Sequence, residues 1–312
     1  MRHVFIINPV AGPKNSAKTL LDRIEAAFPE GDGVEAYTTA GAGDAGRLAL
    51  RALEKGDPVR LYACGGDGTL NEVVNAAAGK SWAAVTNVPM GTGNDFLRIF
   101  GREGKTRFTD LSDLKEGPQA EYDLIDCNGL LGLDVVCVGV DARVAADVHR
   151  FKRLPLVGKK LAYILSLIAT VLKGIVRPMA VEMGPIRHKG PTALVCVCNG
   201  QYYGGGFRPV PEARPDDGVL DVLLVGDVSL LTFAGCVGKY AKGRYKECPQ
   251  LVRDWHGDRV EIRSDEELVS VVDGEVLRDT SFTIRLSERK VNFFRPAGVE
   301  LQWEKTPAGT TL

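Results

Sequence analysis

Up to about residue 121, apolar runs alternate with segments in which apolar residues recur every three or four positions. The runs at 4–7, 59–63 and 83–88, and an alternating segment at 35–39, are typical of strands. The segments between them place apolar residues on one face of a helix, as Leu70, Val73, Val74 and Ala77 do. Strands that alternate with helices predict an open, mostly parallel sheet covered by helices.

After about residue 121 the rhythm changes to strands with few helices between them. The strands are expected at 122–127, 133–140, 193–198, 220–225, 260–262, 268–272 and 282–286. Helical spacing returns at 159–173 and 229–240 only. This pattern predicts a second, β-rich domain that begins near Glu121.

Composition fits a chain of 312 residues that forms two ordinary hydrophobic cores. Lys and Arg total 39 against 40 Asp and Glu, so no overall positive field favours nucleic acid. The seven cysteines form no C-x-x-C pair, which predicts reduced thiols and a cytoplasmic location. Lysines interrupt the most apolar stretch, near residues 154–176, so no membrane-spanning helix is expected.

A glycine-rich loop at residues 64–72 is the strongest candidate for chemistry. Gly65, Gly66 and Gly68 lie between a predicted strand and a predicted helix, where backbone N–H groups are free to bind phosphate. Asp67 would repel a bare phosphate but suits one that arrives with Mg²⁺. The alternative is a βα turn whose glycines serve geometry alone.

Two further loops, at residues 8–12 and 89–96, also follow predicted strands. Ligands of open α/β sheets bind outside the carboxyl ends of the strands, so the three loops are expected to converge on one nucleotide. Thr39 also follows a strand, ahead of a helix that Asp44 is expected to cap.

The segment GGDGTLNEVVNA at 65–76 resembles the nucleotide loop of the diacylglycerol kinase catalytic family, which includes bacterial lipid kinases, sphingosine kinases and ceramide kinases. The family patterns NP-x-x-G, T-x-x-x-G-D-A and P-x-G-T-x-N-D-F are matched at 8–12, 39–45 and 89–96. The resemblance implies an N-terminal Rossmann-like nucleotide-binding α/β domain and a C-terminal β-sandwich domain. On this basis residues 1–121 bind ATP, residues 122–292 bind the lipid substrate, and residues 293–312 return to the first domain.

The resemblance also implies which residues bind ATP. They are Asn8, Pro9, Val10, Ala11, Gly12, Thr39, Gly66, Asp67, Gly68, Thr69, Leu70, Asn71, Glu72, Thr92, Asp95 and Asp123. Among them, Asp67, Asp95 and Asp123 match acids that the family links through water to the Mg²⁺ of the nucleotide.

A second signature spans residues 199–222 and contains the adjacent acids Asp216 and Asp217. Asp-rich segments with glycine commonly form turns, and their oxygens also suit Mg²⁺ or Ca²⁺. The resemblance implies a structural Mg²⁺ held by Asp217 and by the backbone oxygens of Arg214 and Val219. Arg214 departs from relatives that have a hydroxyl residue there.

The segment Asp273-Gly274-Glu275 reads from its residues as a hairpin turn. It matches the family's D-G-E motif, in which an acid accepts the proton of the lipid hydroxyl. The resemblance therefore implies Asp273 as the catalytic base, Glu275 as the second choice, and Asp67 as the third catalytic acid.

Together these features predict an ATP-dependent lipid kinase that phosphorylates the hydroxyl of a diacylglycerol-like lipid. The open alternatives are a kinase of a sphingoid base, phosphatidylglycerol or NAD, and a non-catalytic nucleotide-binding relative. The expected partner is a lipid at a membrane surface, met peripherally through a basic run, with a homodimer as an open alternative and nucleic acid not expected. That run comprises Lys239, Lys242, Arg244 and Lys246.

Overall fold

The computed structural model describes residues 1–29, 33–91, 93–101, 103–152, 170 and 174–304. The chain divides into two compact units. The N-terminal unit contains Met1–Leu124 and Ser287–Glu304, and the β-rich unit contains Ile125–Leu286. The sequence-based division lay a few residues away, at 121/122 and 292/293.

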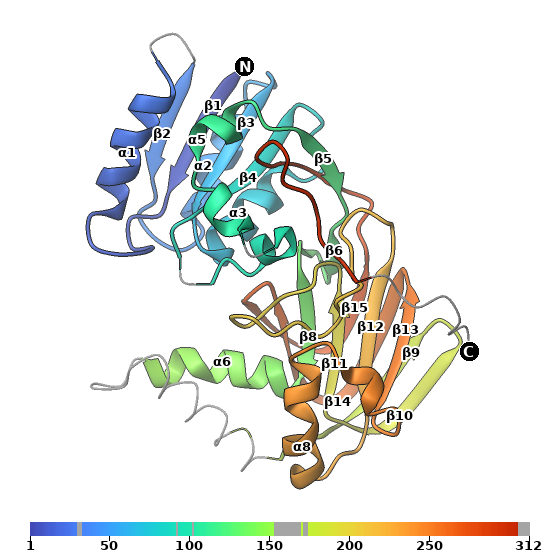
Figure 1. Cartoon of the computed structure of the whole chain (residues 1–312). Coiled ribbons are helices and arrows are strands. Elements are labelled where there is room, and N and C mark those ends of the chain that lie inside the picture. Colours follow the sequence, from blue (N-terminus) through green and yellow to red (C-terminus); the bar gives the residue numbers. More distant parts are fainter. Residues whose placement is uncertain (30–32, 92, 102, 153–169, 171–173, 305–312) are drawn as a thin grey trace. The chain divides into compact units, whose positions relative to one another are not determined.

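The N-terminal unit is built on one six-stranded sheet with the order β2-β1-β3-β4-β16-β5 (Figure 1). All neighbouring strands are parallel except β16 and β5. The strands are β1 (Arg2–Ile7), β2 (Val34–Thr38), β3 (Val59–Gly65), β4 (Ala83–Pro89), β5 (Gln119–Tyr122) and β16 (Val291–Phe294). Strand β16 therefore brings the late part of the chain back into the first sheet, between β4 and β5.

Helices cover the two faces of this sheet. Helix α2 packs against α3, and α1 packs against α5. The helices are α1 (Ser16–Ala27), α2 (Asp44–Leu53), α3 (Asp67–Ala77), α4 (Gly104–Arg107) and α5 (Leu111–Lys115), with a 3-10 turn η1 (Phe96–Phe100). The N-cap of α2 is Gly43, so the expectation that Asp44 caps it was wrong; the Asp44 carboxylate instead accepts the Ala40 N–H at 2.7 Å.

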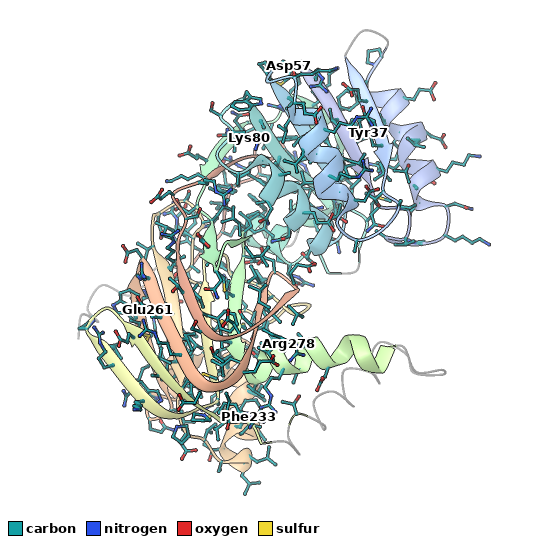
Figure 2. The ribbon with its side chains drawn as sticks, turned by 180° about the vertical axis from the view of Figure 1, so that it is seen from behind. Tyr37, Asp57, Lys80, Phe233, Glu261 and Arg278 are labelled. Atoms are coloured by element: carbon teal, nitrogen blue, oxygen red, sulfur yellow. The ribbon has the colours of Figure 1, made fainter. Side chains whose placement is uncertain are left out.

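The strand order reverses between β1 and β3. The chain leaves β1 for β2 on one side, and β3 then lies on the other side of β1. In open α/β sheets this reversal is where ligands bind, at the carboxyl ends of the strands. At the opposite edge Arg2 pairs with Glu35 at 2.7 Å and with Asp57 at 2.8 Å, which ties down the first strand (Asp57 is labelled in Figure 2).

The β-rich unit contains a ten-stranded sheet with the path β13-β12-β11-β8-β14-β15-β6-β7, and β9 pairs with both β10 and β14. Its strands are β6 (Ile125–Cys127), β7 (Leu130–Gly132), β8 (Val135–Gly139), β9 (Arg177–Met183), β10 (Ile186–Thr192), β11 (Leu194–Cys198), β12 (Leu220–Val225), β13 (Val252–Gly257), β14 (Arg259–Val272) and β15 (Glu275–Leu286). It also contains α6 (Val140–Lys152), α8 (Leu230–Tyr240) and the 3-10 turn η2 (Tyr245–Glu247).

Two apolar cores lie on opposite faces of the central strands of this unit. Val195 and Val197, on one face of β11, pack in a core with residues of β9, β12, β14 and β15. Leu194 and Cys196, on the other face, pack in a second core that also contains Tyr240 of α8. Because both faces are buried, β11 is a continuous apolar run rather than an alternating one.

The fold class expected from the sequence is confirmed, an α/β domain followed by a β-rich domain, and the errors lie in individual elements. The expected strand 122–127 is two strands, because the chain passes from one unit to the other after Leu124. The expected strands 260–262 and 268–272 are one strand, β14, whose pairing with β15 shifts between Arg263 and Leu268. The β9–β10 hairpin, α6 and β13 were missed, and the helix expected at 159–173 lies, apart from Thr170, outside the described residues.

No helix within the described residues is long and apolar enough to cross a membrane.

Candidate active site

The loops after β1, β3 and β4 meet at one edge of the first sheet. The Asn8 side-chain amide donates to Thr69 Oγ1 at 3.2 Å, which joins the first loop to the start of α3. Met90 N donates to the Gly65 carbonyl at 3.0 Å, which joins the β3 and β4 loops. The convergence expected from the sequence is therefore present in the structure.

The first loop is a tight turn beside this junction. Ala11 N donates to the Asn8 carbonyl at 3.2 Å, and Gly12 has a φ of +81°. A Cβ on Gly12 would lie 2.6 Å from the Met90 carbonyl oxygen, so a larger residue cannot fit here without a shift. Pro9 lies within the turn, and Val10 at its tip is 87% exposed.

Asp67 connects the β3 loop to the β4 loop. Its carboxylate accepts the N–H of Asn94 at 2.8 Å and that of Asp95 at 2.6 Å. A Cβ on Gly93 would lie 2.4 Å from Asp67 Oδ2, so the chain passes directly over the carboxylate. A metal was the expected reason for this acid, whereas backbone N–H donors already stabilise its charge.

Asn94 reinforces the same junction from the buried side. It is 0% exposed, has a φ of +55°, and donates to the Gly65 carbonyl at 2.9 Å and to Asn87 Oδ1 at 2.8 Å. A Cβ on Gly91 would lie 2.8 Å from the Gly66 Cα, so the two loops touch backbone to backbone. Thr92, a predicted nucleotide contact in this loop, lies outside the described residues.

Four other predicted nucleotide residues have structural contacts within the N-terminal unit. Thr39 follows β2, and its N–H donates to the Ile7 carbonyl at 2.9 Å. Glu72 on α3 accepts the N–H groups of Gly43 and Gly46 at 2.8 and 3.1 Å, so its side chain satisfies the N-terminus of α2. Asn71 is buried and accepts from Asn75, and Leu70 is part of the core.

Gly66 is the N-cap of α3 and Gly68 is in its first turn, so both lie where α3 presents its N–H groups. This end of a helix favours an anion such as phosphate.

Asp95 and Asp123, the two other acids expected near the Mg²⁺ of the nucleotide, are paired with cations. Asp95 accepts from Arg98 Nε at 2.9 Å, and Asp123, which is 1% exposed, lies 2.9 Å from the ammonium of Lys290. The hydrogen bond to Asp123 raises the pKa of Lys290. Within the described residues no three His, Cys, Asp or Glu side chains are grouped so that they could hold a metal ion.

Lys105 is a residue at this edge that the motifs did not reveal. Its ammonium lies 3.3 Å from the Gly91 carbonyl oxygen and 3.2 Å from that of Gly93. A cation therefore lies against the glycine loop that follows β4. No sequence signal marked it, because a lone lysine in a short helix has no distinctive spacing.

In the β-rich unit, Asp273 lies in the turn between β14 and β15 with a φ of +46°. Its carboxylate accepts N–H groups from three consecutive residues: Leu133 at 2.6 Å, Asp134 at 3.1 Å and Val135 at 2.9 Å. Three N–H donors to one carboxylate hold it in a fixed orientation. Asp273 therefore fixes the segment that leads into β8, a contact that the D-G-E motif did not predict.

The neighbouring signature residues assemble around the same segment. Asn199 donates to the Leu133 carbonyl at 2.7 Å, and the Gly200 N–H donates to the Asp134 carbonyl at 2.8 Å. Glu275, the second predicted acid, lies at the start of β15 with an exposed side chain. The D-G-E turn and the segment after β11 thus form one hydrogen-bonded group.

Asp217 lies on an exposed turn ahead of β12, and Gly218 beside it has a φ of +75°. Its neighbours have partners: Asp216 pairs with Arg214 at 2.9 Å, and Asp221 lies 2.6 Å from His256 Nδ1. Asp217 accepts the Val219 N–H at 3.1 Å. Partial burial, together with the charges of Asp221 and Asp216, raises the pKa of Asp217, a setting that suits a bound cation.

The basic run, which begins at Lys239 in the last turn of α8, is largely paired with acids. The pairs are Lys239–Glu247 at 3.5 Å, Arg244–Glu247 at 2.5 Å and Lys246–Glu212 at 2.5 Å. These contacts reduce the local positive charge that the sequence analysis expected to meet anionic lipid.

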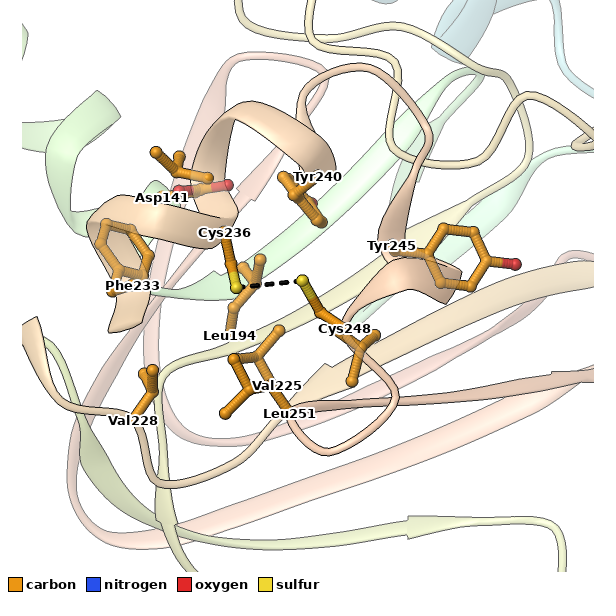
Figure 3. Close-up of a pocket in the computed structure, with 12 residues that line it drawn as sticks. Asp141, Leu194, Val225, Val228, Phe233, Cys236, Tyr240, Tyr245, Cys248 and Leu251 are labelled. Atoms are coloured by element: carbon orange, nitrogen blue, oxygen red, sulfur yellow. Dashed lines mark hydrogen bonds between the residues drawn. The ribbon is translucent and has the colours of Figure 1, made fainter. Parts of the chain in front are cut away.

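An apolar pocket lies between α8, η2 and the strands β11 to β13 (Figure 3). Phe233 and Val237 of α8 line it on one side, and Leu251 and Val252 line it on another. Its one acidic residue is Asp141 at the start of α6. The pocket could not be predicted from the sequence, because its residues come from segments far apart in the chain.

The Asp141 carboxylate accepts a hydrogen bond from the Tyr203 hydroxyl, which lies 3.1 Å from the hydroxyl of Tyr240. Desolvation raises the pKa of Asp141 to about 6, although the Tyr203 hydroxyl partly offsets this effect. The carboxylate is engaged with the tyrosines, and the pocket wall is almost entirely apolar.

Comparison with protein families gives two matches that cover most of the chain. Residues 2–127 match the diacylglycerol kinase catalytic domain. Residues 134–295 match the YegS C-terminal NAD kinase beta sandwich-like domain.

Individual relatives agree with these matches. The chain is 30% identical over 271 residues to "Probable lipid kinase YegS-like" of Pseudomonas aeruginosa. The aligned region covers 83% of each of the two chains. A crystal structure of a diacylglycerol kinase from Bacillus anthracis superposes with a TM-score of 0.69 at 21% identity. It covers 96% of this chain and 98% of its own, which supports the fold of both units.

Proposed function

Because this chain belongs to the family of lipid kinases that combine a diacylglycerol kinase catalytic domain with a YegS C-terminal domain, we propose that it transfers the γ-phosphate of ATP to the hydroxyl of a diacylglycerol-like lipid. The observation that carries the choice of a lipid acceptor is the apolar pocket of the β-rich unit. Membership of a kinase family implies the use of ATP.

ATP binds at the switch point of the first sheet. The N-terminus of α3, with Gly66, Gly68 and Thr69, supplies N–H groups to the phosphates. The turn at Asn8–Gly12 packs against the same loop and forms a second wall. Lys105, which already lies against the β4 loop, adds positive charge near the phosphates. Asp67 joins the loop after β3 to the loop after β4, so its main contribution is to position these two loops.

The lipid tail binds in the apolar pocket beneath α8. Carbon and sulfur atoms of Phe233, Val237, Leu251 and Cys248 form its wall, which suits an alkyl chain and offers little to a polar molecule such as NAD. An apolar ligand gains free energy there by leaving water.

Phosphoryl transfer joins the hydroxyl oxygen of the lipid to the γ-phosphorus while the bond to the β-phosphate oxygen breaks. ADP leaves, and Asp273 accepts the hydroxyl proton. Its three N–H donors fix its orientation, and a loose transition state needs an oriented acceptor more than a strong base. Glu275 is the alternative proton acceptor, because its side chain is exposed and it lies two residues after Asp273 in the same turn.

Mg²⁺ is the proposed divalent cation, and it neutralises phosphate charge when it arrives with the nucleotide. A second, structural Mg²⁺ is proposed at Asp217 with the backbone oxygens of Arg214 and Val219. The raised pKa of Asp217 beside two other acids supports this site.

The membrane partner is proposed to meet α8. Leu230 and Leu231, at the start of this helix, are 48% and 87% exposed. Exposed leucines on a short helix are typical of elements that enter the headgroup region of a bilayer. Because the neighbouring basic side chains are paired, vesicle binding is expected to depend more on Leu231 than on salt concentration.

The test is an acceptor comparison at saturating ATP and Mg²⁺. Diacylglycerol, phosphatidylglycerol and a sphingoid base are each offered in mixed micelles, and NAD is offered in solution. The proposal expects phosphate on diacylglycerol or a related lipid alcohol and none on NAD. Phosphorylation of NAD alone would overturn the lipid assignment.

A further inference from the structure

Two cysteine thiols face each other across the apolar pocket. Cys248 Sγ lies 3.0 Å from Cys236 Sγ (Figure 3). Both residues line the pocket, Cys236 from α8 and Cys248 from the segment after η2. A disulfide has an S–S distance of about 2.05 Å, so an approach of roughly 1 Å would join them.

The two walls that these thiols connect are held in different ways. Cys248 is 2% exposed, and its backbone carbonyl accepts the N–H groups of Leu251 and Val252 at 3.0 and 3.1 Å. Helix α8, in contrast, has only Tyr240 buried among its residues. Helix α8 is therefore the less buried wall. Its Lys239 pairs with Glu247 beside Cys248, but both side chains are exposed and such a pair adds little stability, so α8 is the wall that moves more easily.

Movement of α8 is necessary if a lipid tail is to bind. The cavity measures about 40 Å³. At about 10–15 Å³ per water molecule by the same measure, it holds roughly three waters and not an acyl chain. The pocket has to widen by separation of α8 from the segment that carries Cys248.

We propose that Cys236 and Cys248 form a reversible disulfide that locks this pocket closed. The covalent link would fix α8 against the segment after η2 at the point where the two walls must part. The link itself is independent of the function proposed above, and its effect on lipid binding rests on that function.

The oxidant is a low-molecular-weight disulfide such as oxidised glutathione. The thiolate of Cys236, the more accessible of the two, attacks one sulfur of glutathione disulfide and releases one glutathione thiol. The thiolate of Cys248 then attacks the sulfur of Cys236 and releases the second. Two protein thiols are oxidised and one small disulfide is reduced to two thiols. Dithiothreitol reverses both steps.

The first measurement maps the link in the full-length protein. After treatment with oxidised glutathione, free thiols are expected to fall from seven to five. Trypsin separates the two cysteines, because Lys239, Lys242, Arg244 and Lys246 lie between them. A linked pair of tryptic peptides is therefore the expected product. Seven free thiols, or a link among Cys137, Cys196 and Cys198 instead, would overturn the proposal.

The second measurement is the binding of a fluorescent long-chain diacylglycerol to reduced and oxidised protein. The oxidised wild type is expected to bind at least tenfold more weakly and to recover in dithiothreitol, with ATP binding unchanged. Cys236→Ser and Cys248→Ser should bind equally in both conditions, whereas Cys127→Ala, in the core on the other face of the sheet, should respond as wild type does.

Equal binding by the linked and reduced wild-type proteins would refute the lock while leaving the mapped disulfide in place. Absence of lipid binding by the reduced protein would instead refute both the lipid pocket and the lock. The two failures are therefore distinguishable.

Discussion

Replacement of Asp141 by asparagine should make the protein more stable at neutral pH. Asp141 is the acid beside the apolar pocket, and its environment raises its pKa from 3.8 to about 6. Asparagine has nearly the same shape and can still accept the hydrogen bond from Tyr203. The substitution therefore removes the ionisation while keeping the packing.

The size of the effect follows from proton linkage. The folded protein holds the proton of Asp141 up to about pH 6, whereas the unfolded chain releases it near pH 3.8. Between these values the unfolded state loses its proton first, so stability falls as pH rises and stays low above pH 6. The difference between pKa values of 3.8 and about 6 corresponds to about 3 kcal/mol, which is an upper bound because Asp141 is only partly buried.

The assay is guanidinium unfolding of the wild type and Asp141→Asn at pH 4 and pH 8. Trp255 reports the β-rich unit if Trp82 and Trp303 are first replaced by phenylalanine in both proteins. The variant should match the wild type at pH 4 and exceed it by about 1–3 kcal/mol at pH 8.

A matched control is the exposed acid Asp258, whose replacement by asparagine should produce no such pH-dependent difference. If Asp141→Asn is less stable than the wild type at pH 8, or if the difference between the two proteins is the same at both pH values, the stated environment of Asp141 is wrong.

Three further substitutions test the remaining assignments. Asp67→Ala should lower the free energy of unfolding by about 2 kcal/mol, because the N–H groups of Asn94 and Asp95 lose a charged acceptor. It should also remove ATP binding. Unchanged thermal stability would argue against the role of Asp67 as a bridge between the loops. Asp273→Asn should slow the chemical step by about 10²–10⁴-fold with ATP affinity unchanged, and a larger loss for Glu275→Gln would move the base to Glu275. Chelation should lower the melting temperature of the wild type but scarcely that of Asp217→Asn, and equal shifts in both proteins would exclude a metal at that acid.

The sheet and its loops could be predicted because each rests on local signals. The apolar run before Gly65 and the helical spacing after Asp67 placed a strand and a helix around the glycines. Parallel pairing then brought the ends of β1, β3 and β4 to one edge, as expected. The family pattern added residue identities, but what each side chain contacts followed only from the structure.

The contacts of the acids could not be predicted, because they depend on backbone atoms far away in the chain. Asp273 accepts N–H groups about 140 residues earlier, and Asp67 accepts them from the next loop. A motif marks an acid but not the donors that surround it. The pocket was hidden for the same reason, since Asp141, Phe233 and Leu251 belong to separate elements.

The central claim is that this chain phosphorylates a lipid alcohol. The most direct test incubates the protein with ATP, Mg²⁺ and an unfractionated lipid extract, and compares the products with those of Asp67→Ala by mass spectrometry. We expect one class of lipid to gain the mass of a phosphate only with the wild type. An extract with no phosphorylated lipid, from protein that still binds ATP, would contradict the claim.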